Sequence, residues 1–228
     1  MNQTVIKEML DNAVHFGHKT QKWNPKMRKY LFGARNGVHI FDLEKTEIAL
    51  DKAVDFLRNA AASGKTILFV STKPQAAELM KEAAEAVKMP FVVHKWMGGL
   101  LTNFTTMKQR IRYYKTLKEQ EKSGGFEKYT KKEAVVLRKE IEKLDAALGG
   151  VIDVERLPDV IFLADAVRDR IVVREANKVK IPVVAIADSN ANPDGIAYPI
   201  PGNDDAVKSL TYLIHKVKSA ILGGKGTK

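Results

Sequence analysis

Short runs of consecutive apolar residues are the feature that most constrains how this chain can fold. Three runs rich in β-branched residues lie at 66–71, 159–164 and 182–187, and shorter ones lie at 91–94 and 38–41. A strand with one face in water alternates polar and apolar residues, whereas an unbroken apolar run indicates a strand that is covered on both faces. We therefore expect these segments to be strands of a parallel sheet between two layers of helices.

The segments between these runs have the periodicity of amphipathic helices. They lie at 43–63, 74–87, 169–179 and 204–222, and the last of them places apolar residues at helical spacing from Val207 to Val217. Helices and strands therefore alternate along the chain. This order predicts an α/β fold with a doubly wound parallel sheet of the Rossmann or flavodoxin type.

Residues 102–148 depart from this alternation because they contain no strand pattern. Two helical segments meet there at Ser123-Gly124-Gly125, which predicts a protruding antiparallel helical hairpin of the coiled-coil kind. We expect a discontinuous α/β domain at 1–101 and 149–222, with the hairpin inserted at 102–148. Residues 223–228 read Gly-Gly-Lys-Gly-Thr-Lys and are expected to form a disordered basic tail.

The positive charge of the chain is concentrated in two windows. The net charge is +11, from 38 basic and 27 acidic residues. Residues 12–41, the first acid-free window, and residues 86–118, the second, contain no Asp or Glu and hold 13 of the 38 basic residues. The rest of the chain is nearly neutral, so the excess is local. A local excess of this size favours a polyanionic partner over a general solubility charge.

The composition also excludes several classes of protein. Without cysteine the chain has no disulfide scaffold, thiolate metal site or cysteine nucleophile, which is typical of a reducing compartment. The N-terminus lacks the apolar core of a signal peptide, and no apolar run approaches the roughly 20 residues that span a bilayer. We therefore expect a cytoplasmic protein with no membrane partner.

No catalytic or cofactor motif is complete. Residues 63–66, Ser-Gly-Lys-Thr, resemble the end of a phosphate-binding loop, but they precede a strand and lack the first glycine of that motif. Gly-x-Gly-x-x-Gly is absent, and no Ser–His–Asp set or carboxylate pair has a suitable spacing. We expect no cofactor and no enzymatic activity.

Two polar features stay open at this point. Ser71-Thr72-Lys73 follows an expected strand, so it fits a phosphate site at a helix N-terminus as well as an ordinary capped turn. His15 and His18 could share a metal ion if they were helical, with Asp188 as a third ligand. Gly17 weakens a helix there, so we favour a packing or RNA-contact role and expect no metal.

Both acid-free windows combine cations with aromatic and amide side chains. Lysine and arginine neutralise phosphates, and exposed aromatic rings stack on unpaired bases, so this mixture favours RNA. The alternative is that the tryptophans anchor the core and the lysines are merely solvated. The predicted contact residues are Lys19, Lys22, Trp23, Asn24, Lys26, Arg28, Lys29 and Arg35 in the first window, and Lys95, Trp96, Asn103, Lys108, Arg110, Arg112 and Lys115 in the second.

Several motifs of the chain resemble the bacterial ribosomal protein S2 family. The N-terminal signature is carried by residues 15–18, 23–27 and 32–40, and the central motif by Trp96-Met97-Gly98-Gly99-Leu100-Leu101-Thr102-Asn103. Further similarity covers 158–177 and 194–206, in the same order as in the family. The segment 187–190 departs slightly from the family pattern, and the C-terminal tail is short.

The resemblance implies a non-catalytic protein of the 30S subunit and the 70S ribosome. It would bind 16S rRNA between the head and body of the subunit, with no DNA partner, and ribosomal protein S1 would dock beside it. Two alternatives stay open. One is a small-molecule enzyme of the same fold that uses Ser71, Thr72, Lys73 and Asp188. The other is a free regulator that binds DNA or RNA.

Overall fold

The computed structural model describes residues 3–226, and its centre is a five-stranded parallel sheet. The strand order is β5-β4-β6-β7-β8. Their bounds are Ile67–Val70 for β4, Phe91–Val92 for β5, Val160–Leu163 for β6, Val183–Ala187 for β7 and Tyr198–Pro201 for β8. The chain adds β5 on one side of β4 and the remaining strands on the other, which is the flavodoxin-like order. The predicted α/β fold is confirmed.

Helices cover both faces of this sheet, as the unbroken apolar runs predict. They are α2 (Leu43–Ala62), α3 (Pro74–Ala86), α6 (Arg170–Lys178) and α7 (Val207–Lys225). Successive strand residues enter opposite cores, so that Phe69 and Phe162 pack beneath α2, α3 and α7 while Leu68 and Leu163 pack on the α6 side. All four residues of β4 and all four of β6 are therefore buried.

Residues 3–41 build a small N-terminal unit. It consists of α1 (Gln3–Asp11), the 3-10 helices η1 (Thr20–Lys22) and η2 (Pro25–Tyr30), and an antiparallel sheet in the order β1-β3-β2. The strands are β1 (Phe16–Lys19), β2 (Leu31–Arg35) and β3 (Val38–Phe41). Asn36 and Gly37 have positive φ and form the two-residue turn that joins β2 to β3. The prediction that 38–41 is a buried strand of the parallel sheet is therefore wrong.

The fifth strand of the parallel sheet is instead β8, which the apolar pattern does not reveal. Its sequence is Tyr198-Pro199-Ile200-Pro201, and proline removes the backbone donor that a central strand needs. β8 pairs only with β7 and lies at the edge of the sheet, where the missing donors cost little. The sheet thus has five strands, as expected, but β8 takes the place that was predicted for residues 38–41.

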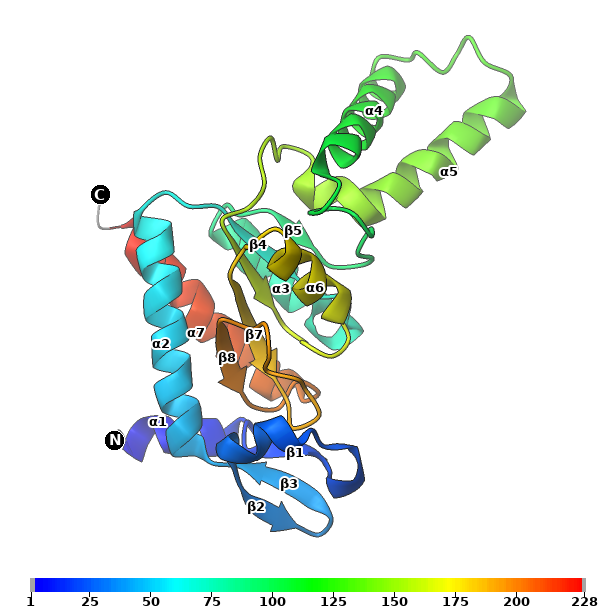
Figure 1. Ribbon diagram of the computed structural model, residues 1–228. Helices are drawn as coiled ribbons and strands as arrows, with labels where there is room; N and C mark the ends of the chain where they lie inside the picture. Colours follow the sequence, from blue (N-terminus) through cyan, green and yellow to red (C-terminus); the bar gives the residue numbers. More distant parts are fainter. Residues whose placement is uncertain (1–2, 227–228) are drawn as a thin grey trace.

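Residues 104–148 form two long helices that project from the body (Figure 1). They are α4 (Phe104–Lys122) and α5 (Lys131–Leu148), and the Thr130–Glu133 capping box starts the second helix. Lys118 Nζ contacts Asp145 Oδ1 at 2.8 Å and Arg138 Nε lies 3.5 Å from Glu121 Oε1, which ties the two helices together. Their inner side chains, including Ile111, belong to the same core as the sheet, so a domain boundary at 102–148 stays a prediction.

The C-terminal segment differs from the expected disordered tail. Helix α7 continues through Gly223 and Gly224 to Lys225, whereas Thr227 and Lys228 lie outside the described residues. A Cβ on Gly224 would stand 2.4 Å from the carbonyl oxygen of Arg58, so this glycine allows α7 to pack closely on α2. The prediction of disorder is wrong for 223–225. Among residues 3–226, no helix is long and apolar enough to cross a membrane.

Candidate nucleic-acid interface

The carboxyl ends of the strands, where this fold usually binds its ligand, are filled by the protein's own charges. Lys73 follows β4 and is only 6% exposed. Its Nζ contacts Asp165 Oδ2 at 3.1 Å, and Asp204 Oδ1 and Asp205 Oδ1 at 2.7 Å each. A lysine ammonium has three donors, and three carboxylates occupy them.

This arrangement decides between the two interpretations of Ser71-Thr72-Lys73. The backbone N–H of Thr72 donates to Asp169 Oδ2 at 3.0 Å, and its hydroxyl donates to Asp169 Oδ1 at 2.7 Å. The donors that a phosphate needs are thus engaged, and nearby carboxylates would repel it. The segment is a structural turn, and the proposed enzyme of the same fold loses its phosphate site.

Crowding of carboxylates changes their ionisation. Burial, together with Asp165 and Asp188, raises the pKa of Asp204 to about 7, although Lys73 opposes the shift. Burial disfavours the charge on Lys73, but Asp204, Asp205 and Asp165 outweigh it and raise the lysine pKa. At pH 7 the Lys73 ammonium therefore stays charged, whereas the Asp204 carboxyl is partly protonated.

The N-terminal unit is fastened to this cluster by His18. The backbone N–H of His18 donates to Ser189 Oγ at 2.8 Å, and its Nδ1 and Nε2 lie 3.1 Å and 3.5 Å from Asp188 Oδ1 and Asp205 Oδ2. The hydrogen bond to Asp188 is the largest of the causes that raise the pKa of His18. Gly17 lies against the same loop, because a Cβ there would stand 2.9 Å from Ser189 Oγ.

Of the metal candidates His15, His18 and Asp188, the structure brings two together. His18 and Asp188 join Asp204 and Asp205, with ligand atoms all within 4.8 Å of one another, and imidazole with carboxylates fits a divalent cation such as Zn²⁺. His15 lies outside the group because the chain there is not helical: His15 precedes β1, whereas His18 lies within this strand. Neither Asp204 nor Asp205 stood out in the sequence, since they follow the unrecognised strand β8.

The first acid-free window exposes most of its cations on the N-terminal unit. Asn24 is anchored by its backbone N–H, which donates to Ser189 O at 2.7 Å, and Trp23 packs against His39 with ring centroids 4.9 Å apart. Lys26 pairs with Asp194, and Lys29 lies over the Tyr30 ring. The remaining predicted cations are exposed and make no ion pair within the described residues: Lys19, Lys22, Arg28 and Arg35.

The second window is organised by a residue that sequence reasoning missed. Glu175 of α6 is buried, and its carboxylate accepts hydrogen bonds from the N–H of Gly99 at 2.8 Å, Leu101 at 3.1 Å and the indole Nε1 of Trp96 at 3.1 Å. Trp96 is 8% exposed and lies in the core. It is therefore withdrawn as an RNA-stacking residue, and the alternative of a core anchor is correct for it.

The other predicted residues of the second window divide into two groups. Lys108 Nζ donates to Glu155 O at 2.9 Å, and Lys115 Nζ pairs with Asp153 Oδ1 at 3.2 Å. The second group is exposed and makes no ion pair within residues 3–226, and it consists of Lys95, Asn103, Arg110 and Arg112. Only this second group offers unengaged side chains to a polyanion.

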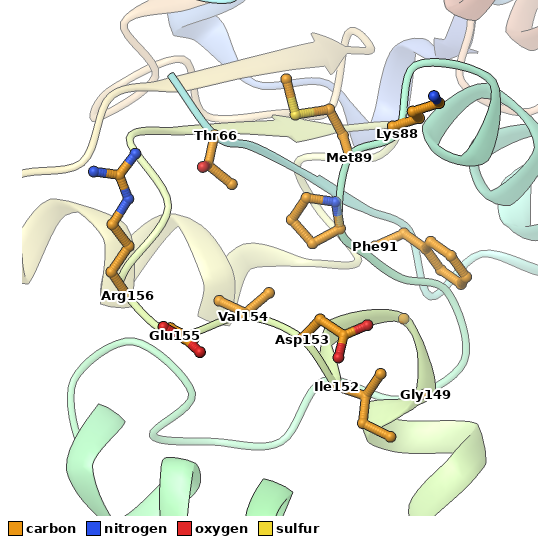
Figure 2. Close-up of a pocket in the computed structure, with 12 residues that line it drawn as sticks. Thr66, Lys88, Met89, Phe91, Gly149, Ile152, Asp153, Val154, Glu155 and Arg156 are labelled. Carbon is orange, nitrogen blue, oxygen red and sulfur yellow. The ribbon is translucent and has the colours of Figure 1, made fainter. Parts of the chain in front are cut away.

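A cavity of about 630 Å³ lies between the sheet and the loop that follows α5. Figure 2 shows Thr66 and Met89 on one side of it and Asp153, Val154 and Glu155 on the other. It lies at the amino ends of the strands, opposite the usual ligand position of the fold. Its lining mixes both signs of charge and contains no nucleophile–base pair, so it supports neither catalysis nor a phosphate.

Comparison with known proteins agrees with the motifs. A profile of the family described as Ribosomal protein S2 matches residues 9–224. The small ribosomal subunit protein uS2 of Campylobacter curvus is 48% identical over 220 residues, which are 96% of this chain and 84% of that protein. The uS2 protein of Dictyoglomus thermophilum is 47% identical over 225 residues, or 99% and 92% of the two chains. The uS2 protein of Hahella chejuensis is 46% identical over 224 residues, or 98% and 88%.

These matches cover nearly the whole chain, and the family profile runs from the end of α1 through α4 and α5 into α7. The α/β sheet, the order of the motifs and the relatives all agree. The chain belongs to the ribosomal protein S2 family, the uS2 proteins of the small ribosomal subunit.

Proposed function

We propose that this chain is a structural constituent of the small ribosomal subunit that binds 16S rRNA between head and body and supports docking of ribosomal protein S1. Family membership supports a role in translation that is not enzymatic. The observation that carries the RNA contact is the set of exposed cations in the first window that have no acidic partner.

The geometry of the first window supports contact with structured RNA. The cations stand on the small sheet and on the two 3-10 helices beside it, which His18 and Asn24 fasten to the body, so their positions relative to one another are held. Cations on a fixed surface neutralise a fixed set of phosphates, with little ordering cost on binding. The half-buried ring of Trp23 lies beside them, within reach of an unpaired base or a sugar.

Sedimentation of a cell lysate tests the assignment. Under low-salt conditions with magnesium, we expect the protein to travel with 30S particles and 70S ribosomes. A protein that stays at the top of the gradient would instead be a free nucleic-acid-binding regulator. Nuclease treatment of the lysate is the control, because it should release the protein together with fragments of 16S rRNA.

Docking of ribosomal protein S1 rests on family membership alone. Subunits assembled without this chain should lose S1 while they keep the other small-subunit proteins, and adding the purified chain back should restore S1. Equal amounts of S1 in both preparations would remove this part of the proposal and leave the RNA-binding part intact.

A second, smaller role concerns the group of His18, Asp188, Asp204 and Asp205, which we infer can hold a divalent cation. The proximity of the four ligand groups favours this role, and a cation there would join the N-terminal unit to the sheet. Titration with Zn²⁺ should give binding that His18→Ala abolishes and His15→Ala retains. The same affinity in both variants would place the metal elsewhere or make its binding unspecific.

A further inference from the structure

A second pocket lies beside the Lys73 cluster, at the carboxyl ends of β6 and β7. It has a volume of about 240 Å³ and is bounded by α6, by the loop after β7 and by Asn24 of the first window. Ligand sites for whole small molecules are usually larger, from roughly 300 Å³ upward. The size therefore suits one part of a polymer, such as a single base, better than a free metabolite.

Three asparagine amides give this pocket a fixed set of donors and acceptors. The Oδ1 of Asn24 accepts from the N–H of Lys26 at 3.0 Å, and the Oδ1 of Asn192 accepts from the N–H of Asp194 at 3.1 Å. Each of these amides therefore keeps its N–H₂ group for another partner. The Oδ1 of Asn190 is buried and has no partner among the described residues. A buried polar atom without a partner is costly, and a ligand that donates to it would remove that cost.

Two arginines stand at the same pocket. Arg170 and Arg174 lie one turn apart on α6, so they share a face of the helix. Both are exposed, and neither makes an ion pair or a hydrogen bond among residues 3–226. The carboxylate at the pocket, Asp194, is paired with Lys26 and does not neutralise them. Guanidinium groups with this freedom are suited to bidentate contact with a phosphate.

The remaining wall is apolar and consists of Ala166, Val167 and Val173. An apolar wall beside amide donors and an amide acceptor matches a base, which has a flat face and a polar edge. A peptide carboxylate would use the arginines but would leave the amide set without a role. The pocket also continues the first window through Asn24, whose backbone N–H donates to Ser189 O of the body.

We propose that this pocket binds one unpaired nucleotide of 16S rRNA, an inference that rests on the proposed function. The base lies against Ala166, Val167 and Val173, and the three asparagine amides contact its edge. The adjoining phosphate lies on Arg170 and Arg174. This makes α6 a second RNA-contact element, far in sequence from both acid-free windows.

The test compares 30S particles assembled with the wild-type chain and with three variants. Arg170→Gln/Arg174→Gln removes the phosphate contacts, and Asn190→Leu removes the unpartnered acceptor. Lys178→Gln/Lys180→Gln is the matched control, because it removes the same charge at the other end of α6. Base-specific chemical probing of 16S rRNA measures the reactivity of each unpaired nucleotide in every particle.

We expect one unpaired nucleotide to become at least 5-fold more reactive in the Asn190→Leu and Arg170→Gln/Arg174→Gln particles and to be unchanged in the control. The arginine variant should also reduce the log–log salt slope of association by roughly 0.7 to 0.9 per contact, while Asn190→Leu should not change it. Thermal unfolding of free Asn190→Leu should not be lower than that of the wild type, because no internal hydrogen bond is lost.

Two results would overturn the proposed nucleotide site while leaving the proposed function in place. In the first, the wild-type chain enters the 30S particle, but no variant changes the reactivity of any unpaired nucleotide of 16S rRNA. The other is unchanged base reactivity together with the loss of a crosslink from this pocket to a neighbouring protein. If the wild-type chain does not enter the particle, the proposed function fails and the pocket fails with it.

Discussion

The two acid-free windows have similar compositions, but their cations have different surroundings. In the first window, Lys19, Lys22 and Arg28 stand exposed with no acidic partner among residues 3–226. In the second, Lys108 donates to the backbone carbonyl of Glu155 and Lys115 pairs with the carboxylate of Asp153; both acceptors follow α5 and are remote in sequence. Folding therefore supplies the second window with the acceptors that its own sequence lacks.

The aromatic residues of the two windows differ in the same way. Trp23 is half-buried beside His39 on the N-terminal unit, whereas Trp96 lies in the core and donates to Glu175. The first window is thus mainly a surface and the second mainly a joint between the sheet and the projecting helices. A count of charges along the chain identifies a candidate surface, and only tertiary contacts decide whether that surface is free for RNA.

The largest effect is expected from Lys22→Ala/Arg28→Ala/Lys29→Ala in the first window. If each cation contacts one phosphate at about 1 kcal/mol, the affinity for 16S rRNA should fall roughly 100-fold at fixed salt. Filter binding or competitive incorporation into 30S particles measures this loss. Because the three side chains are exposed, we expect the variant to fold normally, and circular dichroism checks that it keeps its structure. An affinity within 3-fold of the wild type would show that the first window is not the main contact.

Glu175→Gln tests whether the second window is a structural joint. Both carboxylate oxygens of Glu175 accept hydrogen bonds, whereas a glutamine amide has only one acceptor oxygen. The variant should therefore lose about 2 kcal/mol of unfolding free energy at pH 7. Burial alone would raise the pKa of Glu175, but the hydrogen bonds from Gly99, Trp96 and Leu101 outweigh it and lower the pKa.

Glu175 also determines how the difference in unfolding free energy between the wild type and the variant changes with pH. A carboxyl with a depressed folded-state pKa stabilises the protein above its unfolded value of 4.5, and this contribution is lost as the pH falls through the folded-state value. The stability difference between wild type and Glu175→Gln should therefore shrink below about pH 4.5. Denaturant unfolding at pH 7, 5 and 3.5 measures it, and a constant difference would contradict this account of the joint.

A smaller effect is expected from Lys108→Ala/Lys115→Ala/Lys118→Ala in the second window. Lys115 and Lys118 already pair with Asp153 and Asp145, and Lys108 donates to the backbone carbonyl of Glu155; such exposed contacts contribute little in water. We expect RNA affinity to fall less than 5-fold and the unfolding free energy to fall by about 1 kcal/mol or less. A loss as large as that of the first-window variant would place the second window on the RNA.

The smallest effect is expected from shortening the projecting helices. Replacing residues 120–139 by a four-residue glycine-serine turn removes the distal part but keeps Tyr114, Lys118 and Asp145 at the base. The midpoint of thermal unfolding should fall by no more than about 4 °C, since few buried residues are lost. A loss of cooperative unfolding would show that the distal part belongs to the core.

Much of the fold could be predicted because burial leaves a mark on the sequence. The runs at 66–71, 159–164 and 182–187 became β4, β6 and β7, each covered on both faces. The sequence did not predict β8, because Pro199 and Pro201 are unfavourable in most strands and β8 is an edge strand. The glycines at 223 and 224 led to the prediction of a disordered tail, because the sequence does not show the close contact of Gly224 with α2. The second failure arises because the deciding neighbour, Arg58 of α2, is distant in the chain.

The candidate site was less predictable for the same reason. Lys73 was recognised as lying at a strand end, but the four aspartates that surround it or cap its turn come from the ends of two other strands, β6 and β8, and from the start of α6. Glu175 left no sequence signal because a glutamate in an amphipathic helix is expected at the surface. Arg170 and Arg174 were likewise unremarkable until the pocket beside them was visible.

The salt dependence of association with 30S particles tests the contrast between the windows most directly. Binding is measured at a series of potassium chloride concentrations for the wild type and for the two triple-lysine/arginine variants, which remove equal charge. We predict that the slope of log affinity against log salt falls by roughly 2 to 3 for the first-window variant and by less than about 1 for the second-window variant. Equal changes in both slopes, or a change confined to the second window, would contradict the assignment of the RNA surface.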